Sequence, residues 1–414
     1  MRSKRIIIIG GGFGGIRAAK DLEKHVYKDA EILLIDKDGY HEFSSDYYKI
    51  ASLRLSEKQS KTAENGLSLK QKFHALRGSS IISLKDIIDE NKIRIMIDEV
   101  LRIDAENKCV KTANNGSIDY TWLIVAAGSV SDFYSIEGIR DYALELKTAN
   151  DALNIRNSID ELFISKGKHE TIRLVICGGG YTGCELAGEL IDYVHDLSGI
   201  HDHPKENFSI LIVESKDRLI PPASRWASEK TQKHLTRKGV KISLQSHIIK
   251  ATPTDIKTKE GDSFDYDVLI WTAGVKAGPI CETIKGAELD DKKRLVVDEY
   301  LKVPPYDNIF AIGDSAFYKK NNSAMTAQNA IIQGRFVAYF LKRTIHKMHV
   351  FSYHFHESSF IIPLGGKYAI ADIKNIKISG FVAWLMRRFI ALNYFSSILD
   401  LRRSWKMWRK NDWK

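Results

Sequence analysis

The sequence predicts an α/β protein that combines two Rossmann-like dinucleotide-binding domains, the second inserted into the first. Three observations support this prediction. A glycine-rich strand–turn–helix pattern opens the chain at residues 5–19, and the same pattern returns at residues 171–189. In addition, the strand endings Val125–Gly128 and Trp271–Gly274 repeat one another, as expected of two halves that are built alike.

The first pattern begins with four consecutive isoleucines, which predict a strand of a parallel sheet that is buried on both faces. Gly10, Gly12 and Gly15 follow with the spacing Gly-x-Gly-x-x-Gly. The first glycine makes the turn, the second lets the backbone approach a pyrophosphate, and the third lets helix and strand pack closely. A second strand ends at Asp36, where a carboxylate can hold a ribose hydroxyl.

The second pattern contains Gly178, Gly180 and Gly183 in the same order, and a later strand ends at Glu214. A single glycine-rich turn also occurs for packing alone. Two complete fingerprints, each with its own acid, predict that the chain binds two dinucleotides.

The rest of the chain is assigned around these two units. A helix over Ala149–Ile164 leads into the second unit, and a strand ending in Gly313-Asp314 returns to the first domain. A carboxylate there can accept from a sugar-chain hydroxyl of a flavin, or it can cap the next helix. We therefore expect a first domain over residues 1–147 and 273–345, a second over 148–272, and a C-terminal region over 346–414.

Composition is that of an ordinary globular protein, with 44% hydrophobic and 28% charged residues in 414. Four scattered cysteines form no C-x-x-C pair, which suits a reducing compartment and argues against a disulfide framework or a cysteine metal site. We expect no metal. Because no uncharged apolar run approaches about 20 residues, we also expect no membrane-crossing helix.

The formal charge of +10 suits a polyanionic partner, either nucleic acid or an anionic lipid surface. Much of the excess lies in Arg402–Lys414, which carries six cations and three tryptophans against one Asp. No nucleic-acid-binding module accompanies it, so we expect no nucleic-acid partner. Tryptophan together with Lys and Arg favours a lipid interface.

An amphipathic helix is predicted before this basic tail, within Ile376–Leu401. Its apolar residues recur three or four apart: Phe381, Trp384, Leu385, Phe389, Leu392, Phe395 and Leu399. Such a helix would lie in the plane of a membrane surface and make the C-terminal region membrane-associating. The alternatives are docking on the protein's own core and a homodimer contact.

Together these motifs resemble type II NADH dehydrogenase, the single-subunit NADH:quinone oxidoreductase that pumps no protons, within the two-dinucleotide flavoprotein class. The resemblance covers nearly the whole chain. The sequence segments that carry the resemblance are Gly178–Leu190, Thr272–Gly278, Ala327–Ala330 and the basic, Trp-rich C-terminus. It implies a respiratory-chain flavoprotein, peripheral on the cytoplasmic side of the cell membrane, that passes hydride from NADH to FAD and two electrons to a quinone.

The resemblance also implies site residues. On the FAD side they are Gly10, Gly12, Phe13, Gly14, Gly15, Asp36, Lys37, Val100, Ala127, Gly128, Gly313, Asp314, Ala327 and Gln328. On the NADH side they are Gly178, Gly180, Tyr181, Thr182, Gly183, Glu214 and Gly274. Glu185 matches an acid near the stacked nicotinamide and flavin, or it is a helix-start carboxylate that complements the dipole.

One departure concerns the quinone segment. The family reads Ala-Gln-x-Ala-x-Gln, whereas Ile332 stands here at the second glutamine site. Gln333 follows, but five residues after Gln328 is about 140° round a helix. We therefore expect Gln328 to meet the quinone and Gln333 to face elsewhere.

The sequence leaves two rival functions open. A sulfide:quinone reductase works through cysteines beside the flavin, and the cysteine spacing offers no obvious pair; Cys177 and Cys184 are expected to pack in the core. A redox-sensing, apoptosis-factor-like protein would bind both dinucleotides but turn over slowly.

Overall fold

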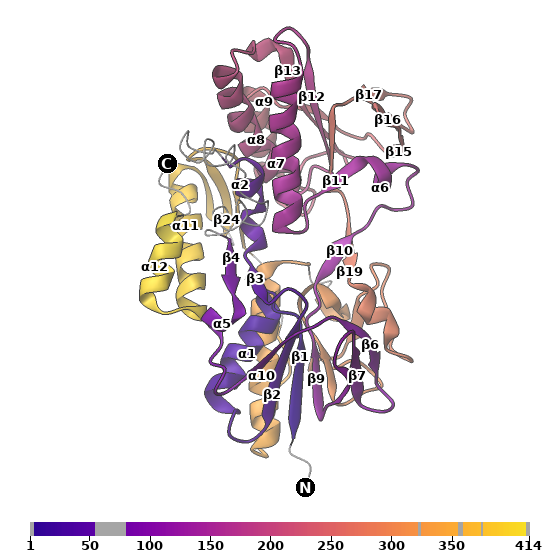
Figure 1. The fold of residues 1–414 in the computed structure, drawn as a ribbon, viewed down its shortest axis with the longest axis vertical. Helices are drawn as coiled ribbons and strands as arrows, with labels where there is room; N and C mark the ends of the chain where they lie inside the picture. The colour runs from indigo at the N-terminus through magenta and orange to yellow at the C-terminus, as the bar shows by residue number, and fades with distance from the viewer. Residues whose placement is uncertain (1–3, 54–79, 322–323, 355–358, 374–375, 411–414) are drawn as a thin grey trace.

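The computed structural model describes residues 4–53, 80–321, 324–354, 359–373 and 376–410 (Figure 1). The first domain contains a five-stranded parallel sheet in the order β21-β9-β1-β2-β5. Its strands are β1 (Arg5–Ile9), β2 (Glu31–Asp36), β5 (Arg94–Ile97), β9 (Trp122–Val125) and β21 (Ile309–Ala311). The four isoleucines of β1 are buried, as the unbroken apolar run predicts.

Helices α1 (Phe13–His25) and α10 (Ala327–Ile345) pack closely together beside this sheet. Their contact depends on glycine, because a Cβ on Gly334 would lie 2.3 Å from the carbonyl oxygen of Gly14. Gly334 therefore permits the close packing, and α10 from the end of the domain is held directly against the first fingerprint helix.

The second domain contains another five-stranded parallel sheet, in the order β11-β18-β12-β13-β14. Its strands are β11 (Ala143–Glu145), β12 (Ile172–Cys177), β13 (Phe208–Val213), β14 (Lys241–Ser243) and β18 (Val268–Trp271). Its helices are α6 (Ile139–Tyr142), α7 (Ala149–Ser165), α8 (Tyr181–Ile200) and α9 (Arg225–Arg237). The Thr148 and Asp151 side chains form a capping box at the start of α7.

The order of strands confirms the predicted insertion. The first sheet takes β9 from before the second domain and β21 from after it. The predicted boundary at residue 148 is too late, because β11 already pairs with β18 of the second sheet. Three residues of β11 gave too short a pattern to assign from the sequence.

Smaller elements complete the two domains. Two three-stranded antiparallel sheets are β6 (Val100–Asp104), β7 (Cys109–Thr112), β8 (Gly116–Asp119) and β15 (Ile248–Ala251), β16 (Asp255–Thr258), β17 (Ser263–Asp265). Two-stranded pairs are β3 (Tyr40–Glu42) with β4 (Ile81–Ser83), β10 (Ser129–Ser131) with β19 (Val275–Ala277), and β20 (Leu295–Val297) with β22 (Ala316–Tyr318). Short helices are η1 (Ser44–Asp46), α2 (Tyr47–Ala51), α5 (Leu84–Ile87), η3 (Lys205–Asn207), η4 (Pro279–Thr283), η5 (Gly313–Ser315) and η6 (Lys319–Asn321).

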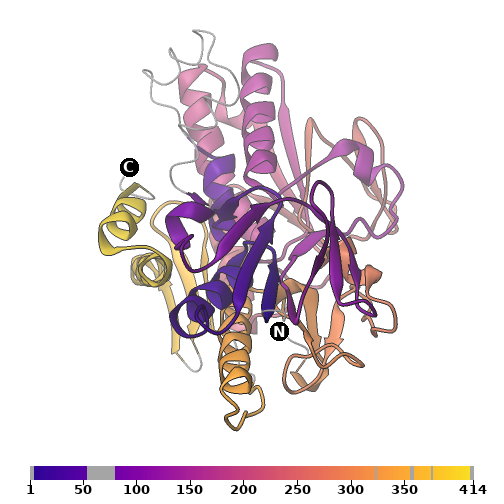
Figure 2. The ribbon, with the colours of Figure 1, turned by 60° about the horizontal axis from the view of Figure 1, so that its bottom comes forward.

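The C-terminal region combines strands with helices. An antiparallel sheet of β23 (Phe360–Pro363), β24 (Ala369–Ile373) and β25 (Ile376–Gly380) comes first. The expected helix then begins at Phe381, and the region ends in α11 (Phe381–Ile398) and α12 (Leu401–Lys410). Figures 1 and 2 show α11 and α12 side by side along one flank of the molecule.

The predicted single apolar stripe of this helix is wrong. Trp384 and Phe395 are buried, whereas Phe381 and Phe389 are more than half exposed. The reason is that α11 is apolar almost all round: Ala383, Ala391, Tyr394 and Ile398 pack inward, and Val382 and Ile390 face outward. Periodicity alone does not identify the buried face of such a helix. Within the described ranges, none of the helices is both long and apolar enough to cross a membrane.

Candidate active site

The first fingerprint loop is held by backbone and side-chain bonds from the neighbouring strand. Gly10 donates its N–H to the Ile35 carbonyl at 2.8 Å, and Gly11 donates to Asp36 Oδ2 at 2.7 Å. The other carboxylate oxygen of Asp36 accepts from the Gly39 N–H at 2.9 Å. The acid predicted for a ribose hydroxyl thus also fixes the loop itself.

The second loop repeats this arrangement. Gly178 donates to the Val213 carbonyl at 2.8 Å, and Gly179 donates to Glu214 Oε2 at 2.7 Å. Glu214 Oε1 accepts from the Lys216 N–H at 2.9 Å. The equivalence of the two fingerprints therefore extends from their sequence to their hydrogen bonds.

Steric fit separates the roles of the glycines. A Cβ on Gly15 or on Gly183 would lie 1.9 Å from the carbonyl oxygen of the first glycine in its own fingerprint. These two positions serve helix–strand packing. A Cβ on Gly12 or on Gly180 would meet nothing within 4 Å. Each loop thus leaves open space at the N-terminus of α1 or α8, where N–H groups and the helix dipole favour a phosphate.

The strand endings that repeat in the sequence close against these loops. A Cβ on Gly10 would lie 2.3 Å from the Ala126 carbonyl oxygen, and one on Gly178 would lie 2.6 Å from Ala273 Cα. Both glycines have φ above +100°, a conformation that other residues rarely adopt. Each small-residue strand ending therefore lies in close contact with the first glycine of its own fingerprint.

Asp314 lies at the return to the first domain, in η5. Ser129 donates its hydroxyl to Asp314 Oδ2 at 2.6 Å, and Lys147 Nζ donates to Ser129 Oγ at 2.9 Å. The reading of Asp314 as the cap of the next helix is wrong, because Thr326 caps α10. Asp314 and Gly128 remain candidates for the sugar chain of a flavin.

Gln333 faces inward on α10. Its side chain is buried, and Oε1 accepts from the Gly313 N–H at 2.6 Å, so it holds the turn that presents Asp314. Gln328 is exposed at the start of the helix, while Ile332 is partly buried against the hydrophobic core of the first domain. The two glutamines therefore lie on different sides of the helix.

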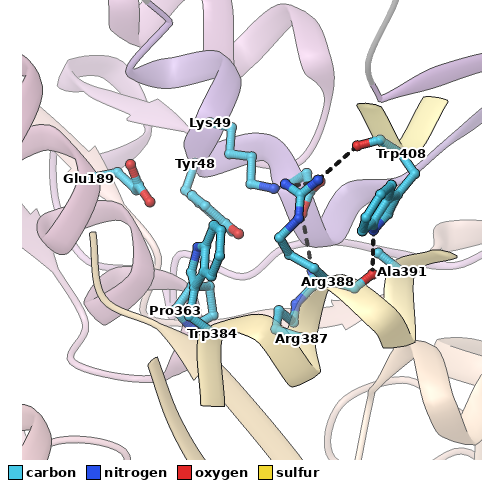
Figure 3. Close-up of a pocket in the computed structure, with 10 residues that line it drawn as sticks. Tyr48, Lys49, Glu189, Pro363, Trp384, Arg387, Arg388, Ala391 and Trp408 are labelled. Carbon is cyan, nitrogen blue, oxygen red and sulfur yellow. Dashed lines mark hydrogen bonds and ion pairs between the residues drawn. The ribbon is translucent and has the colours of Figure 1, made fainter. Parts of the chain in front are cut away.

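Glu185 belongs to a group of charged side chains that we call the Asp46 cluster: Asp46, Lys49, Glu185, Glu189 and Arg387. Asp46 is 1% exposed and binds Arg387 Nη2 at 3.0 Å and Lys49 Nζ at 3.1 Å. Figure 3 shows the pocket that Lys49, Glu189 and Arg387 help to line, with side chains from α2, α8 and α11.

The cluster changes the acidity of its carboxyl groups. Burial raises the pKa of Glu185 to about 8, while the Arg387 charge opposes this shift and the Asp46 charge adds to it. Burial likewise raises the pKa of Glu189 to about 7, with Lys49 opposing. Near neutral pH both groups exchange protons readily, which is suited to acid–base chemistry. The dipole-complementing role is thus a poor account of Glu185.

The other predicted residues are placed around these loops. Phe13 begins α1, and its ring packs on His41 and Tyr394 with centroid distances of 5.2 and 5.1 Å. Tyr181 and Thr182 begin α8, and Ala327 begins α10. The remaining predicted residues are the exposed Lys37, the half-buried Val100, Ala127 and Gly128, and Gly274 after β18.

Sequence reasoning missed Asp46, Arg387 and His41. No local pattern marks them, because each acts through a partner far away in the chain. Arg387 lies 341 residues from Asp46 and contacts it only after α11 has docked beside α2. His41 lies in the three-residue strand β3, which pairs with β4.

Comparison with known proteins places the chain among dinucleotide oxidoreductases. Residues 4–334 match the family described as pyridine nucleotide-disulphide oxidoreductase. A curated protein of Staphylococcus aureus strain MSSA476, named type II NADH:quinone oxidoreductase, is 26% identical over 401 residues, covering 94% of both chains.

Two solved structures share the fold. NDH2 from Plasmodium falciparum in complex with NADH matches with a TM-score of 0.83 at 18% identity, covering 100% of this chain and 99% of that one. The sulfide:quinone oxidoreductase of Aquifex aeolicus matches with a TM-score of 0.77 at 16% identity, covering 99% and 92%.

Proposed function

The chain belongs to the pyridine nucleotide-disulphide oxidoreductase family, and from this premise we propose that it is a non-electrogenic NADH:quinone oxidoreductase with FAD in the first domain. The resemblance to type II NADH dehydrogenase drawn from the sequence is confirmed by curated relatives of that name. FAD, when bound, accepts a hydride from NADH and supplies two electrons to the acceptor.

The observation that carries this proposal is the pair of equivalent loops. Gly12 and Gly180 both leave open space at a helix N-terminus, and the hydrogen bonds of the two loops match. A protein with one nucleotide site needs only one such loop. The first loop has Asp314 and Gly128 nearby in the same domain for a sugar chain, so we assign FAD to it and NADH to the second.

The Asp46 cluster supports the chemistry. Reduction of a quinone by NADH consumes one proton besides the hydride, so the site needs a group that can deliver one. Glu185, with its pKa near 8, holds a proton at neutral pH and is our candidate donor. Arg387 and Lys49 hold Asp46 in place and tune that pKa. Gln328, exposed at the start of α10, is our candidate contact for the quinone.

Sulfide oxidation is the weaker candidate. All four cysteines are buried and unbridged. Burial raises the pKa of Cys281 to about 12 and raises the pKa of Cys177 and Cys184 as well. A thiol in that state is a poor nucleophile. Cys184 instead donates its thiol to the Gly179 carbonyl, in keeping with the packing role expected for it.

Peripheral membrane attachment, on the cytoplasmic side, completes the proposal. The outer faces of α11 and α12 expose an apolar patch whose side chains are 51–80% exposed: Phe381, Val382, Phe389, Ile390, Leu401 and Trp405. Arg402, Lys406 and Arg409 are exposed beside it. Apolar residues flanked by cations are the combination that binds the interface of anionic bilayers.

Anaerobic titration tests the redox proposal. Purified protein should show a flavin absorption spectrum that NADH bleaches and a short-chain quinone restores, with steady turnover in air-free quinone solution. Released FMN, or absence of flavin after native purification, would refute the FAD assignment. Bleaching without quinone turnover would favour the slow redox sensor.

Liposome binding tests the membrane proposal. A variant with Phe389→Ser and Ile390→Ser should bind anionic vesicles more weakly, because it loses apolar area on the outer face. The matched control is Ile164→Ser, which changes an isoleucine that is 72% exposed on α7. Equal vesicle binding by the variant and the native protein would exclude this face. A change only in sedimentation without lipid would mark it as a dimer contact.

A further inference from the structure

His41 of β3 connects the first fingerprint loop to the C-terminal helix α11. Its ring is fully buried, with Nδ1 2.9 Å from the Gly11 carbonyl oxygen and Nε2 2.7 Å from the Tyr394 hydroxyl. Tyr394 lies on the inner side of α11, 353 residues away in the chain. The C-terminal helix thus reaches the loop that we assign to FAD.

The direction of each hydrogen bond is fixed by chemistry. A carbonyl oxygen only accepts, so His41 Nδ1 carries the proton. Burial lowers the pKa of His41 to about 4, against the opposing effects of the Gly11 bond and the Asp36 charge. The ring is therefore neutral near pH 7, Nε2 is an acceptor, and the Tyr394 hydroxyl donates to it.

This chain of bonds orients one peptide group of the loop. In a trans peptide the N–H points opposite to the preceding carbonyl. Holding the Gly11 carbonyl toward His41 therefore turns the Gly12 N–H away from His41. Within the part of the chain that the structure describes, the Gly12 N–H donates to no protein group, and a Cβ on Gly12 would meet nothing within 4 Å. That N–H is free for a ligand at the start of α1.

Without His41 this orientation would be weakly held. The peptide joins two glycines, so it can rotate without a Cβ clash at either end. The second loop solves the same problem differently, because the Gly179 carbonyl accepts from the Ile220 N–H at 2.7 Å inside its own domain. Of the two loops, only the first has its peptide oriented by a side chain, His41, that is itself held by the C-terminal helix α11.

Packing keeps the Tyr394 hydroxyl in place. Its ring is buried and lies 5.1 Å from Phe13 and 5.5 Å from Phe43, measured between centroids. Phe13 directly follows Gly12 in the fingerprint. The aromatic contacts thus join α11 to the same turn that the hydrogen bonds orient.

We propose that Tyr394 and His41 are positioning residues for the FAD pyrophosphate, so that the docked helix α11 completes the FAD site. The inference rests on the proposed function, since it concerns how that FAD is held. Pre-orienting the Gly12 N–H removes the need for FAD to order the loop when it binds. The second dinucleotide site does not depend on this device.

The test is the affinity of apoprotein for FAD, measured by quenching of flavin fluorescence. Tyr394→Phe removes one hydroxyl and keeps the ring. We expect the Kd for FAD to rise about 3- to 10-fold, the effect of one lost buried hydrogen bond. The Kd for NAD⁺ in FAD-saturated protein should stay unchanged. The matched control is Tyr193→Phe, which removes another buried tyrosine hydroxyl that bonds to Asp160 in the second domain.

A second pair of variants guards against a folding defect. His41→Asn keeps a donor for the Gly11 carbonyl and should lose less affinity for FAD than His41→Leu, which removes the donor and should bind at least as weakly as Tyr394→Phe. If Tyr394→Phe melts at a lower temperature but binds FAD like the native protein, the pair is merely structural and the inference is wrong. If the native protein itself binds no FAD, the proposed function fails instead.

Discussion

Alanine at the open glycines should remove cofactors without harming the fold. Gly12 and Gly180 face space that no described protein atom fills within 4 Å of an added Cβ, and both have extended backbone angles that alanine adopts freely. We therefore expect the apoproteins of Gly12→Ala and Gly180→Ala to melt within about 1 °C of the native apoprotein, since a compatible Gly→Ala change alters stability by under about 1 kcal/mol.

Cofactor binding should respond differently. A methyl group in that space displaces a pyrophosphate from the helix N-terminus and lengthens charge-assisted hydrogen bonds worth roughly 1.5–3 kcal/mol each. One lost bond corresponds to a roughly 10- to 100-fold higher Kd. Gly12→Ala should lose this affinity for FAD alone. Gly180→Ala should keep FAD and show a correspondingly higher KM for NADH.

The closed glycines supply the contrast. In Gly15→Ala or Gly183→Ala the new Cβ would lie 1.9 Å from a backbone oxygen, where contacts below 3.0 Å essentially never occur. Strand and helix would have to separate by about 1 Å, an overpacking that costs roughly 1–3 kcal/mol or more. These variants should melt at lower temperature even without cofactor.

Differential scanning fluorimetry of apoproteins and equilibrium binding of FAD and NAD⁺ separate the two classes. If Gly12→Ala and Gly180→Ala bind both cofactors like the native protein, the open space is not the cofactor cradle. If they unfold as readily as the Gly15 and Gly183 variants, the steric distinction is wrong.

Three further predictions concern ionisable groups. The pKa of His41 is lowered from 6.5 to about 4 in the folded protein, so the free energy of unfolding is highest above pH 6.5 and falls as the pH drops toward 4. At pH 5 the loss is roughly 2 kcal/mol. His41→Asn should therefore flatten the dependence of melting temperature on pH between pH 7 and pH 5. The pH–rate limb near 8 that we assign to Glu185 should move up in Arg387→Met and down in Asp46→Asn, and equal limbs in all three proteins would remove Glu185 from the reaction. Glu214→Gln should lower the preference of kcat/KM for NADH over NADPH roughly tenfold, because the charge that repels a 2′-phosphate is gone while one acceptor for the Gly179 N–H remains.

The parts of the site that the sequence predicts are those made by contiguous residues. Each fingerprint is a strand, a turn and a helix in about 15 residues, and its glycines have steric causes that the spacing encodes. Even the inserted topology followed from repetition, because two strand endings matched. That Gln333 and Gln328 face different sides of α10 followed from helix geometry alone.

The parts that escaped prediction depend on tertiary contacts. Asp46 and Arg387 form one ion pair across 341 residues, and His41 meets Tyr394 across 353. Neither pair leaves a periodic signal. The apolar face of α11 failed for a related reason: its outer side is nearly as apolar as its inner side, so only the docked structure distinguishes them.

These contacts change how the C-terminal region should be tested. Arg387 reaches the Asp46 cluster, and Tyr394 reaches the first loop through His41. Arg388, next to Arg387 on α11, is joined to α12 by two hydrogen bonds. Its Nη2 donates to the Trp408 carbonyl at 3.0 Å, and the Trp408 indole N–H donates to the Arg388 carbonyl at 2.9 Å. Truncation before Arg402 would remove Trp408, which is buried, together with the basic tail. A loss of liposome binding in such a protein would then mix membrane contact with displacement of α11. Substitutions confined to the outer face, such as Phe389→Ser with Ile390→Ser, change the membrane contact. They preserve the contacts that the inner side of α11 makes with the Asp46 cluster and with the first fingerprint loop.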